Sequence, residues 1–313
     1  MTPATAPPLF ESPVLLTGPW RSPRQMLNDQ VYDGHSSIHD DATAEKLGFS
    51  GAPIEGPTHF SQFVPLLATL WGTQWFEKGC ISVHYAAPVV EGEEAQASVQ
   101  IASEGTRFAD LHMVKRDGTT VLSGTASVGS DHPATEATTR MGKLRAPERL
   151  VILDQLKVGQ VGAVRERVRM DFDQFLGEFY PFTLAQKLDR ITEPIRWYEP
   201  DAGAASPWGA PIVPLEMISV LSNYTVVQAA GFAIRQPSIG LFLDQEIQLV
   251  RGPILVGTDY VLDREIVALG ESRKTESYWV RTEIHDAVTD ELVAVTLLHQ
   301  GLLKDSYPDY PKD

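Results

Sequence analysis

Apolar positions along the chain recur with two spacings. Segments 58–71 and 215–227 carry apolar side chains at helical spacing and predict two buried helices. Other segments alternate in the manner of strands and are separated by turns such as Asp117-Gly118 and Thr289-Asp290. These strand-like segments are 95–101, 111–114 and 121–128, followed by 260–268, 278–284 and 292–298. The pattern therefore predicts one apolar helix followed by antiparallel strands, and predicts it twice.

Short sequence matches support a duplication. The tetrapeptide GAPI at 51–54 recurs at 209–212, and PVVEG at 88–92 is echoed by PILVG at 253–257. Segment 129–148 between the halves is polar and aperiodic, and we interpret it as a linker over the surface. The predicted domains are therefore 1–140 and 149–313. An apolar helix followed by strands predicts an α+β fold in which each antiparallel sheet wraps around its helix.

Composition narrows the possible partners. The chain has 313 residues, with 26 Lys and Arg against 41 Asp and Glu and a formal net charge of −15. Such a charge disfavours nucleic acid, and no apolar run is long enough to span a membrane. The N-terminus lacks the basic and apolar regions of a signal peptide, so a cytoplasmic protein is the simplest expectation. Cys80, the single cysteine, is interpreted as packing.

Segment 32–61 carries the clearest motif. In order, it contains IHDD at 38–41, Ala44, GF at 48–49, PI at 53–54, and Gly56 at the start of the predicted helix. This order resembles the hydratase motif of MaoC-like (R)-specific enoyl-CoA hydratases and dehydratases. The resemblance implies a double hot-dog fold, a hydro-lyase, an acyl-CoA or related enoyl substrate, and a homodimer or higher homo-oligomer. It implies no cofactor.

The motif also departs from the family pattern. Gly34 stands where the family has its catalytic Asp, Ser36-Ser37 replace Asn-Pro, and Glu55 replaces the His of a His-Gly pair. The expected chemistry is therefore atypical. His35 and His39 are four residues apart, but the sequence offers no evident third ligand, so no metal site is expected.

Three residues of the motif are the catalytic candidates. His39 can exchange protons near neutral pH as a general acid or base. Glu55 is either a carboxylate at a helix terminus or a replacement partner for His39. The backbone N–H of Gly56, at the helix start, can donate to a developing oxyanion. Asp33 is a weaker substitute for the missing Asp, because it is displaced by one residue.

The second half offers an internal comparison. Counting from the shared GAPI, Gly56 corresponds to Pro214, Glu55 to Val213, and His39 falls near Trp197. Proline has no N–H to donate, and valine and tryptophan do not transfer protons. We therefore expect one active site per chain, in the first half. Further substrate-binding candidates, to orient water or substrate or to form an apolar wall, are Tyr32, Asp33, His59, Ser61 and Trp197, although packing explains His59 more simply.

Three functions remain open. The first is a hydro-lyase acting on a double bond conjugated to a thioester. The second is another lyase, an isomerase or a thioesterase that uses a His39–Glu55 pair on a different or CoA-free substrate. The third is a non-catalytic partner subunit of a hydratase complex. Basic residues for a CoA phosphate would come mostly from the second half or from a neighbouring subunit, such as Arg196, Arg235 or Arg251. None of them stands in a recognisable CoA motif.

Overall fold

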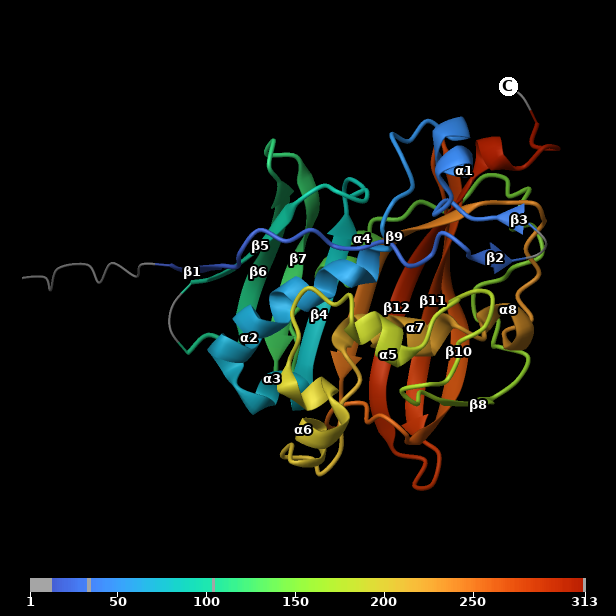
Figure 1. The fold of residues 1–313 in the computed structure, drawn as a ribbon. Coiled ribbons are helices and arrows are strands. Elements are labelled where there is room, and N and C mark those ends of the chain that lie inside the picture. The colour runs from blue at the N-terminus through green and yellow to red at the C-terminus, as the bar shows by residue number, and fades with distance from the viewer. Residues whose placement is uncertain (1–12, 33–34, 103–104, 312–313) are drawn as a thin grey trace, which may run out of the picture.

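A ten-stranded antiparallel sheet forms the body of the protein (Figure 1). The computed structural model describes residues 13–32, 35–102 and 105–311. The strands of the first half are β1 (Val14–Thr17), β4 (Gly79–Tyr85), β5 (Ala95–Ile101), β6 (Phe108–Lys115) and β7 (Thr120–Val128). Those of the second half are β8 (Glu166–Arg169), β9 (Gly240–Leu249), β10 (Asp259–Glu271), β11 (Thr275–Asp286) and β12 (Leu292–Leu303). A separate hairpin pairs β2 (Val31–Tyr32) with β3 (His35–Ser36).

The strand order confirms the duplication. The first half contributes β1-β5-β6-β7-β4 and the second contributes β9-β12-β11-β10-β8, which is the same arrangement reversed. The halves join where β4 pairs with β9, from Cys80↔Gln248 to His84↔Asp244. This pairing makes one continuous sheet with a pseudo-two-fold arrangement.

Helices cover the concave face of this sheet (Figure 1). The first half supplies the 3-10 helix η1 (Gly56–Phe63), then α2 (Val64–Trp71) and α3 (Thr73–Lys78), and the second half supplies α7 (Leu215–Asn223). Predicted helix 58–71 is thus two helices, because Pro65 has no N–H and fits only the first turn of a new helix. The shorter helices are α1 (Asp41–Lys46), α4 (Glu136–Met141), α5 (Leu184–Leu188), η2 (Arg196–Tyr198), α6 (Pro200–Ala204), α8 (Val226–Ala229) and η3 (Lys304–Ser306).

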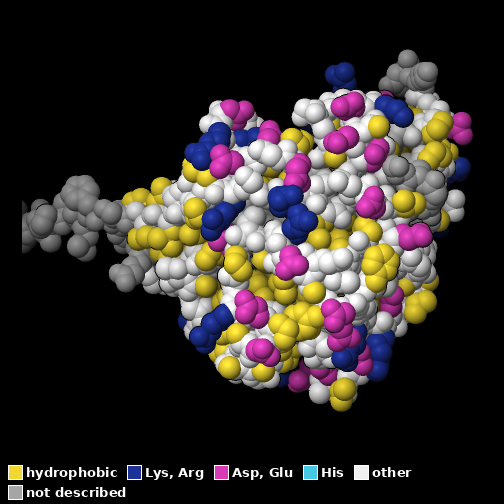
Figure 2. Space-filling model, in the orientation of Figure 1, with side chains coloured by type: hydrophobic (Ala, Val, Ile, Leu, Met, Phe, Trp, Pro, Cys, Tyr) yellow, Lys and Arg dark blue, Asp and Glu magenta, His cyan; other side chains and the backbone are white. Residues whose placement is uncertain are grey.

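The core lies between the sheet and the central helices. Alternate residues of β4, Ile81 and Val83, are fully buried against η1 and α2, whose Phe60, Phe63 and Leu67 are also fully buried. Burying a side chain of this size contributes roughly 1.5–3 kcal/mol each. On the exposed face shown in Figure 2, acidic and basic side chains are interspersed. In the described ranges, no helix combines the length and apolar character that crossing a bilayer requires.

The expected aperiodic linker contains a helix. Thr135 caps α4 by accepting the N–H of Thr138, whose hydroxyl accepts the N–H of Thr135 in return. The fully buried Ala137 donates its N–H to Ser82 Oγ at 2.9 Å on the other face of the sheet from η1. This reciprocal cap stabilises a six-residue helix that hydrophobic periodicity does not reveal, and the linker therefore packs against the sheet through Ala137.

A carboxylate joins the halves on that same outer face. Asp244 of β9 is buried, and its oxygens lie 2.9 Å from His84 Nδ1, 2.6 Å from His299 Nδ1 and 2.8 Å from Arg140 Nε. Burial opposes ionisation, but the hydrogen bonds from His299 and His84 outweigh it and lower the pKa of Asp244 to about 2. The Asp244 carboxylate therefore contacts residues of the first repeat, the second repeat and the linker helix.

A long segment of the first half crosses to the second. Figure 1 shows β2, β3 and α1, in blue, lying over the red and orange strands. Val31 N–H donates to Glu178 O at 3.1 Å, and Gln30 Nε2 donates to Phe179 O at 2.8 Å. The hydratase-like motif is thereby placed against residues of the second repeat.

Candidate active site

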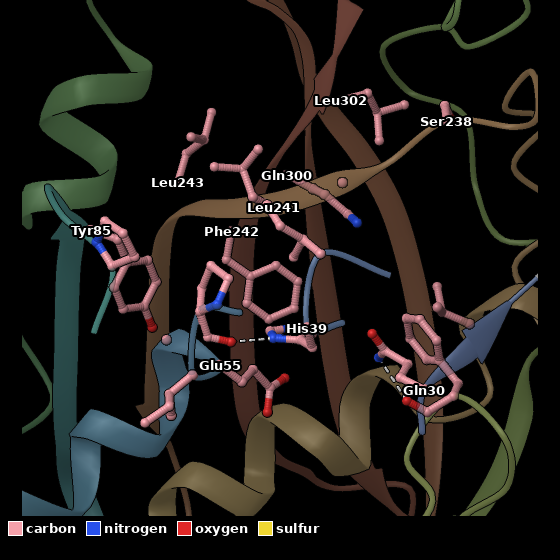
Figure 3. A pocket seen from close by; sticks show the side chains of 18 of the residues that line it. Gln30, His39, Glu55, Tyr85, Ser238, Leu241, Phe242, Leu243, Gln300 and Leu302 are labelled. Atoms are coloured by element: carbon pink, nitrogen blue, oxygen red, sulfur yellow. Dashed lines mark hydrogen bonds between the residues drawn. The ribbon is translucent and has the colours of Figure 1, made fainter. Parts of the chain in front are cut away.

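A cavity of about 540 Å³ opens between the crossing segment, the central helices and the sheet. Both repeats line it (Figure 3). The first contributes His39, Glu55, Gly56, His59 and Tyr85, and the second contributes Tyr180 and the start of β9. The volume is within the range of small-molecule sites, and most of the remaining lining is apolar.

His39 lies between β3 and α1, where Asp40 caps α1 by accepting the N–H of Thr43. Its Nδ1 is 2.6 Å from Pro53 O. Because a carbonyl oxygen only accepts, Nδ1 carries the hydrogen and Nε2 keeps a lone pair. Burial lowers the pKa of His39 to about 4, against a smaller opposing effect of this hydrogen bond. At neutral pH the imidazole is therefore a neutral proton acceptor.

Glu55 is the residue immediately before η1, and its carboxyl group is buried. Tyr180 Oη donates to Glu55 Oε1 at 2.8 Å. Burial raises the pKa of Glu55 to about 7, with Lys187 and the Tyr180 hydrogen bond lowering it and Glu216 raising it. Glu55 thus holds or releases a proton near neutral pH, which is the property that a general acid or base requires.

Gly56 begins η1, where the first N–H groups of a helix have no partner within the helix. A Cβ at this position would lie 2.6 Å from Cζ of Tyr85. The space beside Gly56 Cα is therefore taken by the Tyr85 ring. Tyr85 in turn donates its hydroxyl to Gln245 Oε1 at 3.1 Å.

The remaining predicted residues are dispersed. His59 is buried and lines the cavity, and its Nδ1 has no hydrogen-bond partner among the described residues. Ser61 is buried beside Glu216 and is not among the residues that line the cavity. Asp33 and Gly34 lie outside the described residues, as does the side chain of Tyr32.

Trp197 is also absent from the described lining of this cavity. Its ring packs at right angles against Phe76 and Trp208, with ring centroids 5.2 and 5.1 Å away. Its carbonyl accepts the N–H of Ile212 at 3.0 Å. Trp197 therefore belongs to the aromatic packing near the start of the second repeat's central helix.

A buried charge network lies behind Glu55. Lys187 of α5 donates to Thr58 Oγ1 at 3.1 Å and lies 3.6 Å from Glu216 Oε1. Thr58 belongs to η1 and Glu216 to α7, so the lysine connects the two central helices. Its positive charge also lowers the pKa of Glu55, against the larger effect of burial.

Sequence reasoning missed Tyr180, Lys187 and Glu216. Tyr180 and Lys187 come from segment 170–190, which has little regular structure beyond α5. The pair Thr183 and Gln186 forms a capping box and signals the start of α5. This local signal gives a helix but does not say that the helix packs against the other repeat.

The structure matches residues of the two repeats with an offset one larger than the offset between the two GAPI tetrapeptides. Ile54 N–H donates to Val89 O at 2.7 Å, and Val213 N–H donates to Ile254 O at 2.8 Å. The two bonds occupy the same place before each central helix. Ile54 therefore corresponds to Val213, and not to the isoleucine of the second tetrapeptide.

This shift changes the comparison of the two helix starts. Gly56 is the first residue of η1 and Leu215 is the first residue of α7, so these two residues correspond. Glu55 therefore corresponds to Pro214. The second repeat does have an N–H at that position, so the argument from proline's missing N–H was wrong. What the second repeat lacks there is the carboxyl group.

Charge and metal ligands complete the description. No Lys or Arg is among the described residues that line the cavity. Within the same described ranges, no three His, Cys, Asp or Glu side chains gather in a way that could hold a metal ion.

Comparison with solved structures supports the architecture. A conserved hypothetical protein of Mycobacterium tuberculosis, described as having a double hotdog fold, matches with a TM-score of 0.50 and 11% identity over 84% of this chain and 86% of its own. The fold is a double hot dog. A MaoC-like dehydratase matches with a TM-score of 0.48 and 13% identity, over 84% and 87% of the two chains.

An acyl-CoA thioesterase II of Mycobacterium marinum also matches, with a TM-score of 0.43 and 12% identity over 84% of this chain and 93% of its own. These low identities and scores assign no activity. No family model matches the chain, and neither does any curated protein sequence.

Proposed function

We propose that the protein is a hydro-lyase that adds water to, or removes it from, a double bond conjugated to a thioester or related carbonyl. One observation carries the proposal. A neutral His39 and a Glu55 with a pKa of about 7 face the same largely apolar cavity. Two groups with pKa values displaced from each other are a recurrent arrangement for paired acid and base catalysis.

In the hydration direction, His39 Nε2 accepts a proton from water while the water oxygen bonds to the β-carbon. Protonated Glu55 gives its proton to the α-carbon. The resulting imidazolium then returns a proton to the Glu55 carboxylate, so both residues regain their starting forms. Dehydration is the reverse of these steps, with the same two residues in exchanged roles.

The backbone N–H of Gly56 is suited to the carbonyl oxygen. Negative charge develops on that oxygen as water adds, and an amide at a helix N-terminus stabilises such charge. Tyr85 fixes this turn by packing against Gly56. Tyr180 orients the Glu55 carboxyl group through its hydrogen bond.

A second candidate is the same chemistry on a substrate without CoA, or thioester hydrolysis in the same cavity. It is favoured by the absence of Lys and Arg from the described lining, since a CoA phosphate needs cations. Attack of the activated water on the carbonyl carbon, in place of the β-carbon, would release a thiol.

The test uses 2-enoyl thioesters of several chain lengths, each as the CoA ester and as the uncharged N-acetylcysteamine ester. Loss of conjugated absorbance reports hydration, and a thiol reagent reports hydrolysis. We expect hydration that His39→Ala abolishes and that His112→Ala, at an exposed histidine of β6, leaves unchanged.

The outcomes separate the candidates. Equal rates on both esters would support a CoA-independent hydro-lyase, and thiol release without hydration would support a thioesterase. No reaction on either series at any chain length would overturn both and favour the non-catalytic partner subunit.

A further inference from the structure

The wall of the cavity formed by β9 and β12 contains a polar group that the proposed chemistry does not use. Gln300 of β12 faces the cavity near Leu241 and Phe242 (Figure 3). Tyr278 Oη donates to Gln300 Oε1 at 2.6 Å, which orients the carboxamide. Among the described residues, this bond to Oε1 is the one that the Gln300 side chain makes, and its Nε2 donates to none of them. An oriented donor is thus directed into a largely apolar part of the cavity.

Gly240 makes room for this donor. A Cβ at position 240 would lie 2.6 Å from Gln300 Nε2. Any other residue would therefore displace the amide from its present place. The glycine at the start of β9 and the tyrosine on β11 together hold the amide in one orientation.

The surroundings make the donor selective. Leu241, Phe242, Leu243 and Leu302 supply apolar contacts around it, and the buried Ser238 hydroxyl already donates to Gln236 Oε1 at 3.4 Å. A polar group left without a partner in such surroundings costs free energy. A ligand that satisfies Gln300 therefore binds better than an isosteric ligand that does not.

Strand spacing sets the distance to the proposed reacting end. Gly56 packs against Tyr85 on β4, and Gln300 is two strands away across β9. Neighbouring strands are about 4.8 Å apart, so the separation across the sheet is roughly 10 Å. This is the length of a medium-chain acyl group.

We propose that Gln300 is a specificity-determining residue, and that the substrate carries a hydrogen-bond-accepting oxygen, a ketone or hydroxyl, on its tail about 10 Å from the reacting carbonyl. The inference rests on the proposed function only for the identity of the reacting end. The binding of such a tail oxygen is a separate property of the cavity.

The experiment compares two N-acetylcysteamine thioesters, a ten-carbon straight-chain 2-enoyl ester and its counterpart with a ketone on the penultimate carbon. The ratio of their kcat/KM values measures recognition of the tail oxygen. For the unchanged protein we expect roughly ten- to hundredfold preference for the ketone. Gln300→Leu should abolish the preference or reverse it.

Two further variants guard against a trivial explanation. Gly240→Ala retains Gln300 but crowds its amide, and it should reduce the preference even if Gln300→Leu folds poorly. Gln228→Leu changes an exposed glutamine of α8 and should leave the preference unchanged. A preference that survives both Gln300→Leu and Gly240→Ala would overturn the inference.

A binding measurement keeps the two proposals apart. If neither ester reacts, the hydro-lyase proposal fails, and calorimetry with the saturated versions of the same two esters tests Gln300 alone. Tighter binding of the ketone, lost in Gln300→Leu, would still support the inference. Equal or undetectable binding of both esters by the unchanged protein would overturn it.

Discussion

The two central helices begin in the same way in the backbone and in different ways in the side chains. In the first repeat, Glu55 and Gly56 precede and begin η1, beside a cavity of about 540 Å³. In the second, Pro214 and Leu215 take those places, and the space beside them is a small, mostly apolar cavity of about 20 Å³. Leu215 itself lines that small cavity, together with aromatic side chains such as Phe76.

The two helix starts share a backbone arrangement and differ in two adjacent side chains. The backbone hydrogen bonds just before the helices are 2.7 and 2.8 Å in the two repeats, so the scaffold is retained. A leucine in place of a glycine fills the space, and a proline in place of a glutamate removes the proton carrier. For the proposed chemistry, the first repeat differs from the second in these two adjacent residues and in the crossing segment that brings His39 to the cavity.

Glu55→Gln removes the main chemical difference between the two helix starts, the titratable carboxyl group of the first repeat. The amide has nearly the shape of the carboxyl group but neither gives nor takes a proton, so neither helix start then carries a group that transfers protons. We expect kcat for hydration to fall by roughly 10²–10⁴-fold. Steady-state kinetics on the best substrate of the panel measure this.

The matched control is Glu45→Gln, at an exposed position of α1. It should leave kcat within about twofold of the unchanged protein, since exposed substitutions have small effects. A Glu55→Gln enzyme as active as this control would exclude Glu55 from proton transfer.

The same substitution has a consequence for stability. The Glu55 pKa is raised in the folded state, from 4.5 to about 7, so the folded protein holds a proton that the unfolded chain has lost between those values. Stability contributed by the protonated group is complete below pH 4.5 and is lost as the pH rises through 7. Glutamine stays neutral throughout. Between pH 4.5 and 7 the free energy of unfolding of Glu55→Gln should therefore rise by about 3 kcal/mol relative to that of the unchanged protein.

Urea unfolding at a series of pH values measures the difference between the two proteins. Comparing the two removes the contributions of titrating groups that do not interact with Glu55. A difference that stays constant from pH 4.5 to 7 would show that Glu55 is not buried as a carboxyl group.

Much of the fold followed from the sequence. The strand predicted at 95–101 is β5, and the strands predicted at 121–128 and 292–298 lie within β7 and β12. In β5 buried residues alternate with more exposed ones, as the sequence pattern predicts, whereas β7 and β12 bury residues of both faces over much of their length. The linker helix was missed because a reciprocal cap and one buried alanine leave no periodic trace.

Fewer features of the candidate site could be predicted from the sequence. The local motif gave His39, Glu55 and Gly56, which all line one cavity, because they are close in sequence. Tyr180 lies 125 residues from Glu55, and no local pattern indicates a hydrogen bond over that separation. Trp197 was named by counting from a tetrapeptide, but packing places it with Phe76 and Trp208.

Gly56→Ala tests the difference in space at the two helix starts. The new Cβ would lie 2.6 Å from the Tyr85 ring, whereas the second repeat accommodates a whole leucine at this position. Overpacking of this kind costs typically about 1–3 kcal/mol of the free energy of unfolding, which urea denaturation measures.

A double variant identifies the cause. Tyr85→Ala removes the ring, so adding Gly56→Ala in that background should cost clearly less than it does alone. If the alanine costs the same with and without the ring, the loss comes from the backbone of η1 and not from the contact with Tyr85.

The smallest expected effect concerns Tyr180, the residue of the second repeat that hydrogen-bonds to Glu55 of the first. Tyr180→Phe removes the hydrogen bond to Glu55 Oε1, which stabilises the ionised carboxylate and lowers its pKa. With protonated Glu55 as the acid, we expect kcat/KM for hydration to decline as the pH rises above 7. Without the Tyr180 donor the pKa of Glu55 rises further, so this decline should move to higher pH. At pH 6 we expect at most about a fivefold loss of rate, the value of one hydrogen bond.

Tyr198→Phe, at a buried tyrosine outside the described lining of the cavity, is the control and should leave the pH profile in place. An alkaline limit that does not move in Tyr180→Phe would mean that this limit belongs to a group other than Glu55.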